Sequence, residues 1–190
     1  MHRQRTMKGR CHQQGVGIIE VLVALVVVSF GVLGMAGLQL TGMKHSNNGF
    51  NRSKALILTE NIATRMRINE QGVSNGFYDG FDSGNDANYC NVRPVPYCQA
   101  SKGAAAQSCT AAELAAFDLF SVSCGDWGSE GASGGVEDQL PAGARLVVDC
   151  NDSPCEDTST YTLSVSWPEN RTVRSDDAPV ERRVQMVLRP

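Results

Sequence analysis

The chain has 190 residues with 17 basic and 20 acidic side chains, a formal charge of −3. Four of the basic residues and none of the acidic ones lie in the first 15 positions, so the remaining 13 basic and 20 acidic residues give −7. This acidic balance argues against nucleic-acid binding, which requires a basic face. The length beyond one long helix leaves room for a single modest globular domain.

An apolar run dominates the N-terminal part of the chain. Residues 16–38 are long enough to cross a bilayer, and Glu20 is their only charged residue. A carboxylate inside such a run is costly and by default marks a functional site. Because positive charge gathers on the cytoplasmic flank of a span, the segment before the run is expected in the cytoplasm. The basic residues that precede the run are Arg3, Arg5, Lys8 and Arg10.

The order of a glycine, an apolar run and a glutamate differs from that of a secretory signal, whose cleavage site follows a shorter core. It resembles the class III signal of type IV prepilins. The resemblance implies that a peptidase cuts between Gly15 and Val16 and that Val16, where this family usually has Phe, is then methylated. It also implies that Glu20 neutralises the N-terminal amine of a neighbouring subunit. The alternative is a plain single-pass anchor in which Glu20 is merely favoured by the helix dipole.

The resemblance also implies an organisation in four segments. These are a cleaved leader over residues 1–15, a transmembrane and filament-core helix over 16–40, its amphipathic continuation over 41–70, and a globular periplasmic domain over 71–190. Translation can start at Met1 or at Met7, and either start gives the same mature chain.

Three glycines recur at every third position of the apolar helix: Gly31, Gly34 and Gly37. Small residues allow helices to approach closely in a membrane or filament core, so we expect these glycines to serve helix packing. The alternative is the ordinary tolerance of glycine in a lipid-embedded helix.

The helix is predicted to continue as an amphipathic segment. Apolar residues at three- and four-residue spacing predict one buried face, and they are Ala55, Leu58, Ile62 and Met66. Three charged residues lie off this stripe: Glu60, Arg65 and Arg67. The triplet 47–49 (Asn-Asn-Gly) predicts a kink or local melt, and Gly72 predicts the end of the helix.

Residues 73–108 show no sustained periodicity and are predicted to form loops. An acidic cluster in this region, at Asp79, Asp82, Asn85 and Asp86, offers oxygen ligands for Ca²⁺ but lacks the EF-hand spacing. A solvated loop is therefore the preferred interpretation.

The next segment carries a capping box from Thr110 to Glu113, which predicts a short helix to about Phe120. Residues 126–135 are predicted to form a glycine-rich loop anchored by Trp127.

The last third of the chain is strand-like. Residues 145–150 form one candidate strand, and residues 161–167 alternate clearly between apolar and polar. A third strand places Val184, Met186 and Leu188 on one face. Strands that follow one long helix predict an antiparallel sheet covering that helix, an α+β fold. This is also the plan of the pilin fold.

The cysteines indicate disulfides in an exported domain. Cleavage after Gly15 discards Cys11 and leaves an even set, which is typical of an oxidising compartment. Six cysteines allow 15 pairings; a bridge across the tight turn between Cys150 and Cys155 is preferred, and one between Cys109 and Cys124 is a second expectation. The six candidates are Cys90, Cys98, Cys109, Cys124, Cys150 and Cys155. The sequence contains no Cys-x-x-Cys pair, so zinc binding by these cysteines is a weak alternative to disulfides.

Catalysis is not expected. Residues 131–135 fit the pattern G-x-S-x-G, but a nucleophile elbow requires a strand before the serine and a helix after it. Beyond the leader, His45 is the single histidine, and it adjoins the apolar run, so a Ser-His-Asp triad is not available. We therefore expect no catalytic residue, no cofactor and no metal.

Four short motifs, at residues 63–67, 114–119, 140–141 and 165–167, look like a PilV-type minor pilin. This resemblance implies a role at the filament tip in starting type IV pilus assembly, with effects on twitching motility and adhesion. The implied partners are other minor pilins, the major pilin, prepilin peptidase, the inner-membrane assembly machinery, inner-membrane lipid and a tip adhesin. The implied location is the inner membrane and then the surface pilus. The alternatives are a minor pseudopilin of type II secretion and a membrane-anchored adhesive or ligand-binding module.

Overall fold

The structure is a computed structural model that describes residues 17–100, 105–128, 131–156, 158–169 and 179–189. The chain divides into two units, Met1–Ser46 and Asn47–Pro190, and each is described by itself. Helix α1 (Ile18–Ile68) contributes to both. The elements that follow are α2 (Glu70–Ser74), β1 (Phe81–Asp82), the 3₁₀ turn η1 (Tyr89–Asn91), α3 (Ala111–Ser123), β2 (Gly125–Gly128), β3 (Gly131–Gly134), α4 (Val136–Gln139), β4 (Arg145–Cys150), β5 (Tyr161–Glu169) and β6 (Val180–Leu188).

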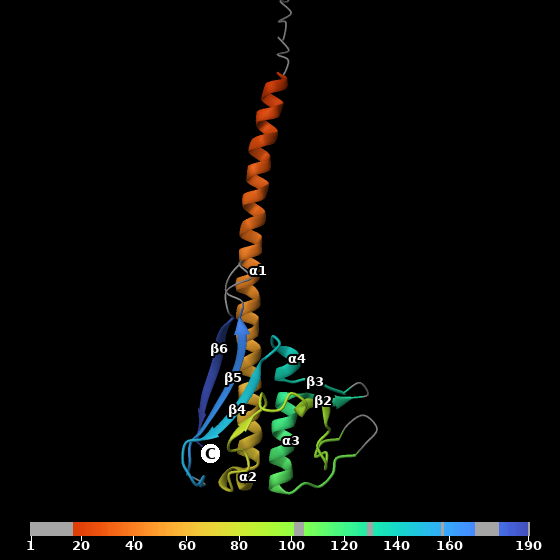
Figure 1. The fold of residues 1–190 in the computed structure, drawn as a ribbon, viewed down its shortest axis with the longest axis vertical. Helices are drawn as coiled ribbons and strands as arrows, with labels where there is room; N and C mark the ends of the chain where they lie inside the picture. Colours follow the sequence, from red (N-terminus) through yellow and green to blue (C-terminus); the bar gives the residue numbers. More distant parts are fainter. Residues whose placement is uncertain (1–16, 101–104, 129–130, 157, 170–178, 190) are drawn as a thin grey trace, which may run out of the picture. The chain divides into compact units, whose positions relative to one another are not determined.

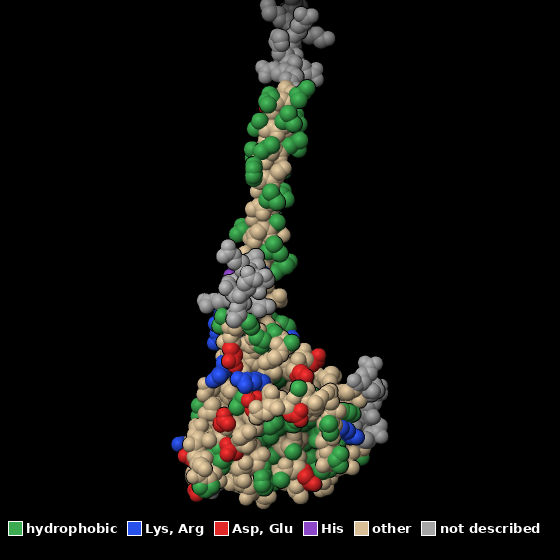
Figure 2. All heavy atoms as spheres, viewed as in Figure 1, with side chains coloured by type: hydrophobic (Ala, Val, Ile, Leu, Met, Phe, Trp, Pro, Cys, Tyr) green, Lys and Arg blue, Asp and Glu red, His purple; other side chains and the backbone are tan. Residues whose placement is uncertain are grey.

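The described part of the first unit is a single stretch of helix. Its large apolar side chains are exposed, and Figure 2 shows them along the visible face of the helix. Among the described residues, α1 is the one helix long and apolar enough to cross a membrane. An apolar N-terminal helix of this kind fits a membrane-anchored chain, and the bounds 16–40 of the anchor stay a prediction.

The second unit is built on an antiparallel sheet. Four strands pair in the order β1-β4-β5-β6, and β5 is joined along its whole length to β6. The strands at 145–150 and 161–167 lie where the alternation predicts them, and the third strand, β6, carries Val184, Met186 and Leu188. Figure 1 shows β4, β5 and β6 beside the later part of α1, with α3 beside the same helix.

The core of this unit lies between α1, α3 and the sheet. Every residue of the predicted helical stripe is buried: Ala55, Leu58, Ile62 and Met66. So is every residue of the apolar face of β5: Tyr161, Leu163, Val165 and Trp167. The α+β pilin-like architecture predicted from the sequence is therefore confirmed, because one helical face and one strand face meet in a common core.

Three local predictions are wrong. The local melt predicted at residues 47–49 is wrong because these residues are helical, while the alternative of a kink there stays a prediction. Gly72 does not end α1, which stops at Ile68; it lies buried in α2, where an added Cβ would stand 2.3 Å from Nδ2 of Asn69. Strands β2 (Gly125–Gly128) and β3 (Gly131–Gly134) pair where the sequence predicts a loop, with Trp127 opposite Ala132.

The capping box is confirmed. The hydroxyl of Thr110 accepts a hydrogen bond from the backbone of Glu113, and the carboxylate of Glu113 accepts one from the backbone of Thr110. Both bonds satisfy free N–H groups at the start of α3. The bonds that the backbone and hydroxyl of Thr110 donate to the carboxylate lower the pKa of Glu113. The helix continues to Ser123, three residues beyond the expected end.

Candidate assembly site

The strongest functional feature of the first unit is an apolar helix surface with one charge. Every large apolar side chain from Ile18 to Met43 is exposed, and Glu20 is the only charged residue of that stretch. Burying one large apolar side chain stabilises by about 1.5–3 kcal/mol. A carboxylate at the centre of a membrane helix costs about 3 kcal/mol. One or two apolar side chains offset that cost, so this surface favours burial in lipid or among other helices despite Glu20.

Glu20 lies in the first turn of α1, where its backbone N–H donates to the carbonyl of Gly17 at 3.0 Å. A carboxylate in this position interacts favourably with the positive end of the helix dipole. Its side chain is exposed within this single chain. The predicted cleavage and methylation positions, Gly15 and Val16, lie outside the described residues, as does Cys11, so these assignments stay predictions.

The three glycines of the apolar helix are not required by the packing of this chain. A Cβ added at Gly31, Gly34 or Gly37 would meet nothing within 4 Å. Each glycine lowers helix stability by about 1 kcal/mol relative to alanine. Their positions therefore leave open space for a close approach by another helix or for lipid.

In the second unit a buried ion pair joins α1 to α3. Nη1 of Arg65 lies 3.0 Å from Oδ1 of Asp118, and the hydroxyl of Tyr78 donates to Oδ2 of Asp118 at 2.7 Å. Asn69 Nδ2 donates to the same Tyr78 hydroxyl at 3.1 Å. Burial raises the pKa of Asp118, while the bonds from Tyr78 and Arg65 oppose that rise. The sequence indicated no partner for Arg65, which lies off the apolar stripe.

A second contact joins the same part of α1 to α4. Lys54 Nζ donates to the carbonyl of Gln139 at 2.8 Å and lies 4.5 Å from the ring centroid of Phe50. The later part of α1 is therefore bonded to the rest of the second unit at two positions, through Lys54 to α4 and through Arg65 to α3.

All six cysteines after the leader form disulfides, as predicted. The preferred bridge between Cys150 and Cys155 is present. The expected bridge between Cys109 and Cys124 is wrong, because Cys98 pairs with Cys109 and Cys90 pairs with Cys124. The bridge from Cys90 reaches across 34 residues and fixes η1 to the end of α3. Sequence spacing could not select it, since the fold brings the two ends together.

The acidic loop uses its carboxylates within the fold. Asp79 accepts a hydrogen bond from the backbone of Cys150 at 2.7 Å, and Asp82 pairs with Arg145 at 3.2 Å. Asp86 accepts one from the backbone of Asn88 at 2.8 Å. These contacts account for the carboxylates structurally and favour the loop interpretation over a calcium site.

Two further groups of potential metal ligands each contain a disulfide. One combines Asp79 with Cys150 and Cys155, and the other combines Glu137 with Cys90 and Cys124. A metal binds the free thiolate, so these bonded sulfurs are not available as thiolate ligands.

The G-x-S-x-G segment does not form a nucleophile elbow. Ser133 lies in β3 of the short hairpin, exposed and opposite Asp126. The strand precedes only the four-residue helix α4, and the single histidine among the described residues, His45, belongs to the first unit. The second unit therefore places no described histidine beside Ser133, and a Ser-His-Asp triad requires one.

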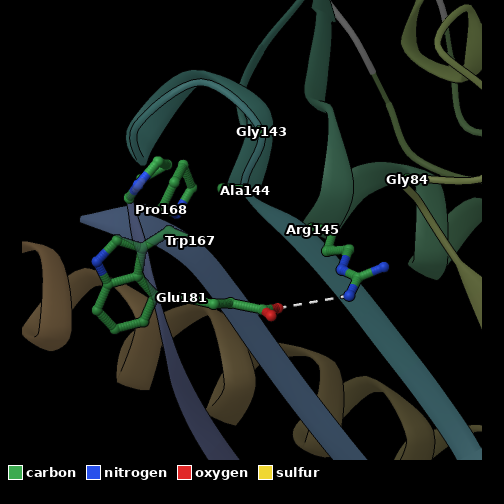
Figure 3. A pocket seen from close by; sticks show the side chains of 8 residues that line it. Gly84, Gly143, Ala144, Arg145, Trp167, Pro168 and Glu181 are labelled. Atoms are coloured by element: carbon green, nitrogen blue, oxygen red, sulfur yellow. Dashed lines mark hydrogen bonds and ion pairs between the residues drawn. The ribbon is translucent and has the colours of Figure 1, made fainter. Parts of the chain in front are cut away.

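One open hollow of about 430 Å³ lies beside the ends of β4, β5 and β6 (Figure 3). Arg145 contacts Glu181 across it at 3.4 Å and also contacts Asp82. Hydrogen bonds from Ser166 and Arg145 lower the pKa of Glu181. Because these charges are already paired with one another, the hollow offers no free charge to a ligand.

Comparison with known proteins gives two matches to family models. Residues 37–120 match the model described as type IV pilin Tt1218, and residues 10–36 match the prokaryotic N-terminal methylation motif. The two matches adjoin and cover the apolar helix, α3 and the loops between them. Searches of curated proteins and of solved structures gave no significant match.

Proposed function

The chain belongs to the type IV pilins, and we propose that it is a minor pilin that joins other minor pilins at the filament tip and helps to start assembly. The observation that carries this proposal is the exposed apolar surface of α1 from Ile18 to Met43, in which Glu20 is the only charged residue. The four PilV-type motifs support the minor subtype. Support of twitching motility and adhesion follows from a role in assembly.

The proposed processing explains why a carboxylate stands at this position. A cut between Gly15 and Val16 creates an α-amino cation at the start of the apolar helix. When helices bundle, both that amine and Glu20 become buried, and a buried charge requires a partner. We propose that Glu20 pairs with the amine of a neighbouring subunit and so sets the axial register, while Gly31, Gly34 and Gly37 allow close helix packing.

The proposal also implies interaction partners and a cellular location for the chain. The motif match implies processing by a prepilin peptidase and contact with other pilus components. We propose that these components include the major pilin, other minor pilins, the inner-membrane assembly machinery and a tip adhesin. The N-terminus faces the cytoplasm and the second unit the periplasm before assembly, in an inner membrane whose lipid surrounds the helix. No catalytic role is proposed, since family membership indicates a structural protein.

Deleting the gene tests this function. We expect few or no surface pili and lost twitching, with normal secretion of exoproteins, and restoration by the intact gene. Normal pili with impaired exoprotein secretion would assign the chain to a type II secretion pseudopilus instead. Pili that assemble and retract normally but fail to adhere would show an anchored adhesive module. Electron microscopy of surface pili and an exoprotein assay on the same strains separate these outcomes.

A further inference from the structure

One row of residues on α1 in the second unit is apolar although it lies on the side of the helix away from the core. Phe50, Ile57 and Ile68 are 59%, 66% and 76% exposed. Because the helix turns about 100° per residue, these three residues lie within about 20° of one another around its axis. Asn61 and Thr64, both exposed and uncharged, lie in the same row. These five residues form the outer stripe of α1.

The outer stripe differs from the exposed side of an ordinary surface helix. Such a helix buries one apolar face and carries polar residues on the opposite face. Helix α1 already buries the face formed by Ala55, Leu58, Ile62 and Met66. Single exposed apolar residues need no explanation, but an uncharged row with three of them over about five turns is typical of a helix that packs on both sides. We therefore expect the outer stripe to contact another molecule.

Charged residues border the outer stripe on both sides. On one side Lys54 and Arg65 are bonded to α4 and α3 of the same unit. On the other side Glu60 and Arg67 are exposed, and among the described residues neither forms an ion pair. A narrow apolar row with charges beside it is the pattern by which two helices pack and select each other. The free charges of Glu60 and Arg67 are therefore available to a partner.

Asn61, in the middle of the outer stripe, has a free hydrogen-bond donor. Its Oδ1 accepts a hydrogen bond from Nε of Arg65 at 2.8 Å, while its Nδ2 donates to no acceptor among the described residues. The hydroxyl of Thr64 is satisfied within the helix, because it donates to the carbonyl of Glu60 at 2.9 Å. A single asparagine in an apolar row between helices fixes their register. The stripe therefore suits a partner that offers one acceptor among apolar side chains.

These polar groups narrow the class of partner. Lipid tails against the stripe would bury Asn61 and bring Glu60 and Arg67 to the edge of hydrocarbon, where charged side chains are costly. A wholly apolar helix, like residues 18–43 of this chain, would likewise leave those three side chains unpaired. An amphipathic helix offers an apolar row together with polar flanks, and it satisfies all of them.

We propose that the outer stripe packs against the amphipathic half of the first helix of another pilus subunit, the counterpart of residues 47–68 of this chain. That helix carries a basic side chain facing Glu60 and an acidic one facing Arg67, because complementary charges beside an apolar row select the partner. This inference rests on the proposed assembly role and names a surface, in the second unit, that serves it.

Photo-cross-linking in cells that assemble pili tests the contact. Benzoylphenylalanine is placed at position 57 of the full chain, and the cross-linked peptides are identified by mass spectrometry. The matched control places it at position 95, where Val95 is 89% exposed in the loop before α3. We expect position 57 to give adducts with the amphipathic half of another pilus subunit's first helix, and position 95 to give none with that helix.

Variants test whether the contact serves assembly. Ile57→Asn should lower recovery of the chain in sheared pili about tenfold, because burial of a side chain of this size is worth at least about one factor of ten. Its urea unfolding in detergent should match that of the wild type, since Ile57 lies outside the core. Val95→Asn should change neither quantity. Glu60→Lys should also lower recovery, and reversing the facing basic residue of the cross-linked partner should restore it.

Three results would overturn this inference. They are adducts at position 57 with lipid alone, adducts with the wholly apolar half of a neighbouring helix, and normal pilus recovery of Ile57→Asn. The proposed assembly role has a separate test, since it fails if deletion of the gene leaves normal pili. Pili that are lost on deletion but keep Ile57→Asn at the wild-type level would refute the outer stripe and retain the assembly role.

Discussion

Arg65 of α1 and Asp118 of α3 form a 3.0 Å ion pair in which the carboxylate side chain is only 4% exposed. Both residues belong to the second unit, where the pair joins the later part of α1 to α3, and the hydroxyl of Tyr78 donates to the other carboxylate oxygen. A buried charge that loses its partner destabilises a protein far more than a surface charge does. The stability of the packing between α1 and α3 should therefore depend on the Arg65 side chain.

Replacing Arg65 with leucine should destabilise the second unit by about 3 kcal/mol, because it leaves Asp118 buried without a cation. The matched control is Arg67→Leu on the exposed side of the same helix, which should change stability by less than about 0.5 kcal/mol. Urea unfolding of the full chain in detergent, followed by the fluorescence of the buried Trp167, measures both. Equal stability of the two variants would show that the ion pair contributes nothing.

The loss in Arg65→Leu should depend on pH. Burial raises the pKa of Asp118 above its unfolded value of about 3.9, so the folded state binds the proton more tightly. Removing Arg65 raises that pKa further. The destabilisation should therefore be small below the unfolded pKa, where Asp118 is protonated in both states, and grow as pH rises towards neutrality. A deficit that stays constant from pH 4 to 7.5, or that grows on acidification, would contradict this assignment.

The three disulfides should differ in their contributions. In the loop-entropy model the bridge over 34 residues contributes about 4 kcal/mol and the bridge over 5 residues about 2 kcal/mol. Changing Cys90 and Cys124 together to alanine should thus cost more than changing Cys150 and Cys155 together. Thermal unfolding of the two double variants gives the comparison. The reverse order would mean that constraint of the unfolded chain is not the dominant effect.

Gly135 should not tolerate a side chain. A Cβ at this position would lie 2.4 Å from the backbone carbon of Cys124, so the close backbone contact between the start of α4 and the end of α3 would have to open. We expect Gly135→Ala to destabilise by about 2–3 kcal/mol or more. Gly128→Ala at the end of β2, where the nearest atom is 3.5 Å away, is the control. Indistinguishable unfolding midpoints for the two variants would show that the backbone contact at Gly135 is looser than described.

Glu20→Gln tests the charge in the apolar helix without changing its shape. The variant should still insert into the membrane, and its insertion should be slightly easier because a neutral amide costs less in lipid than a carboxylate. Its recovery in sheared pili should fall about tenfold or more relative to wild type if Glu20 pairs with a neighbouring amine. Immunoblots of membrane and pilus fractions measure both quantities. Unchanged recovery in pili would leave Glu20 without an assembly role.

The predictable parts of this fold are those in which local pattern and tertiary packing agree. The spacing of Ala55, Leu58 and Ile62 and the alternation in β5 each define one face, and both faces are buried. The β2–β3 hairpin was missed because strands rich in glycine carry no alternating pattern. The ion pair of Arg65 was missed because its partner lies 53 residues away and only the fold brings them together.

In the candidate site too, the features set by local sequence were predictable and those set by tertiary packing were not. The Glu20 position and the apolar run are readable from the sequence because they are local. The pairing of Cys90 with Cys124 depends on how η1 and α3 meet, and no short-range signal encodes that arrangement.

The most direct test of the assembly account is the intact mass and N-terminal sequence of the membrane-purified chain, measured before and after thiol reduction. The account predicts a chain that begins at N-methylated Val16 and gains six hydrogens on reduction, two for each of the three disulfides. A chain that keeps its leader, or one cut after the apolar run, would contradict it, because α1 would then be an ordinary anchor or a discarded signal.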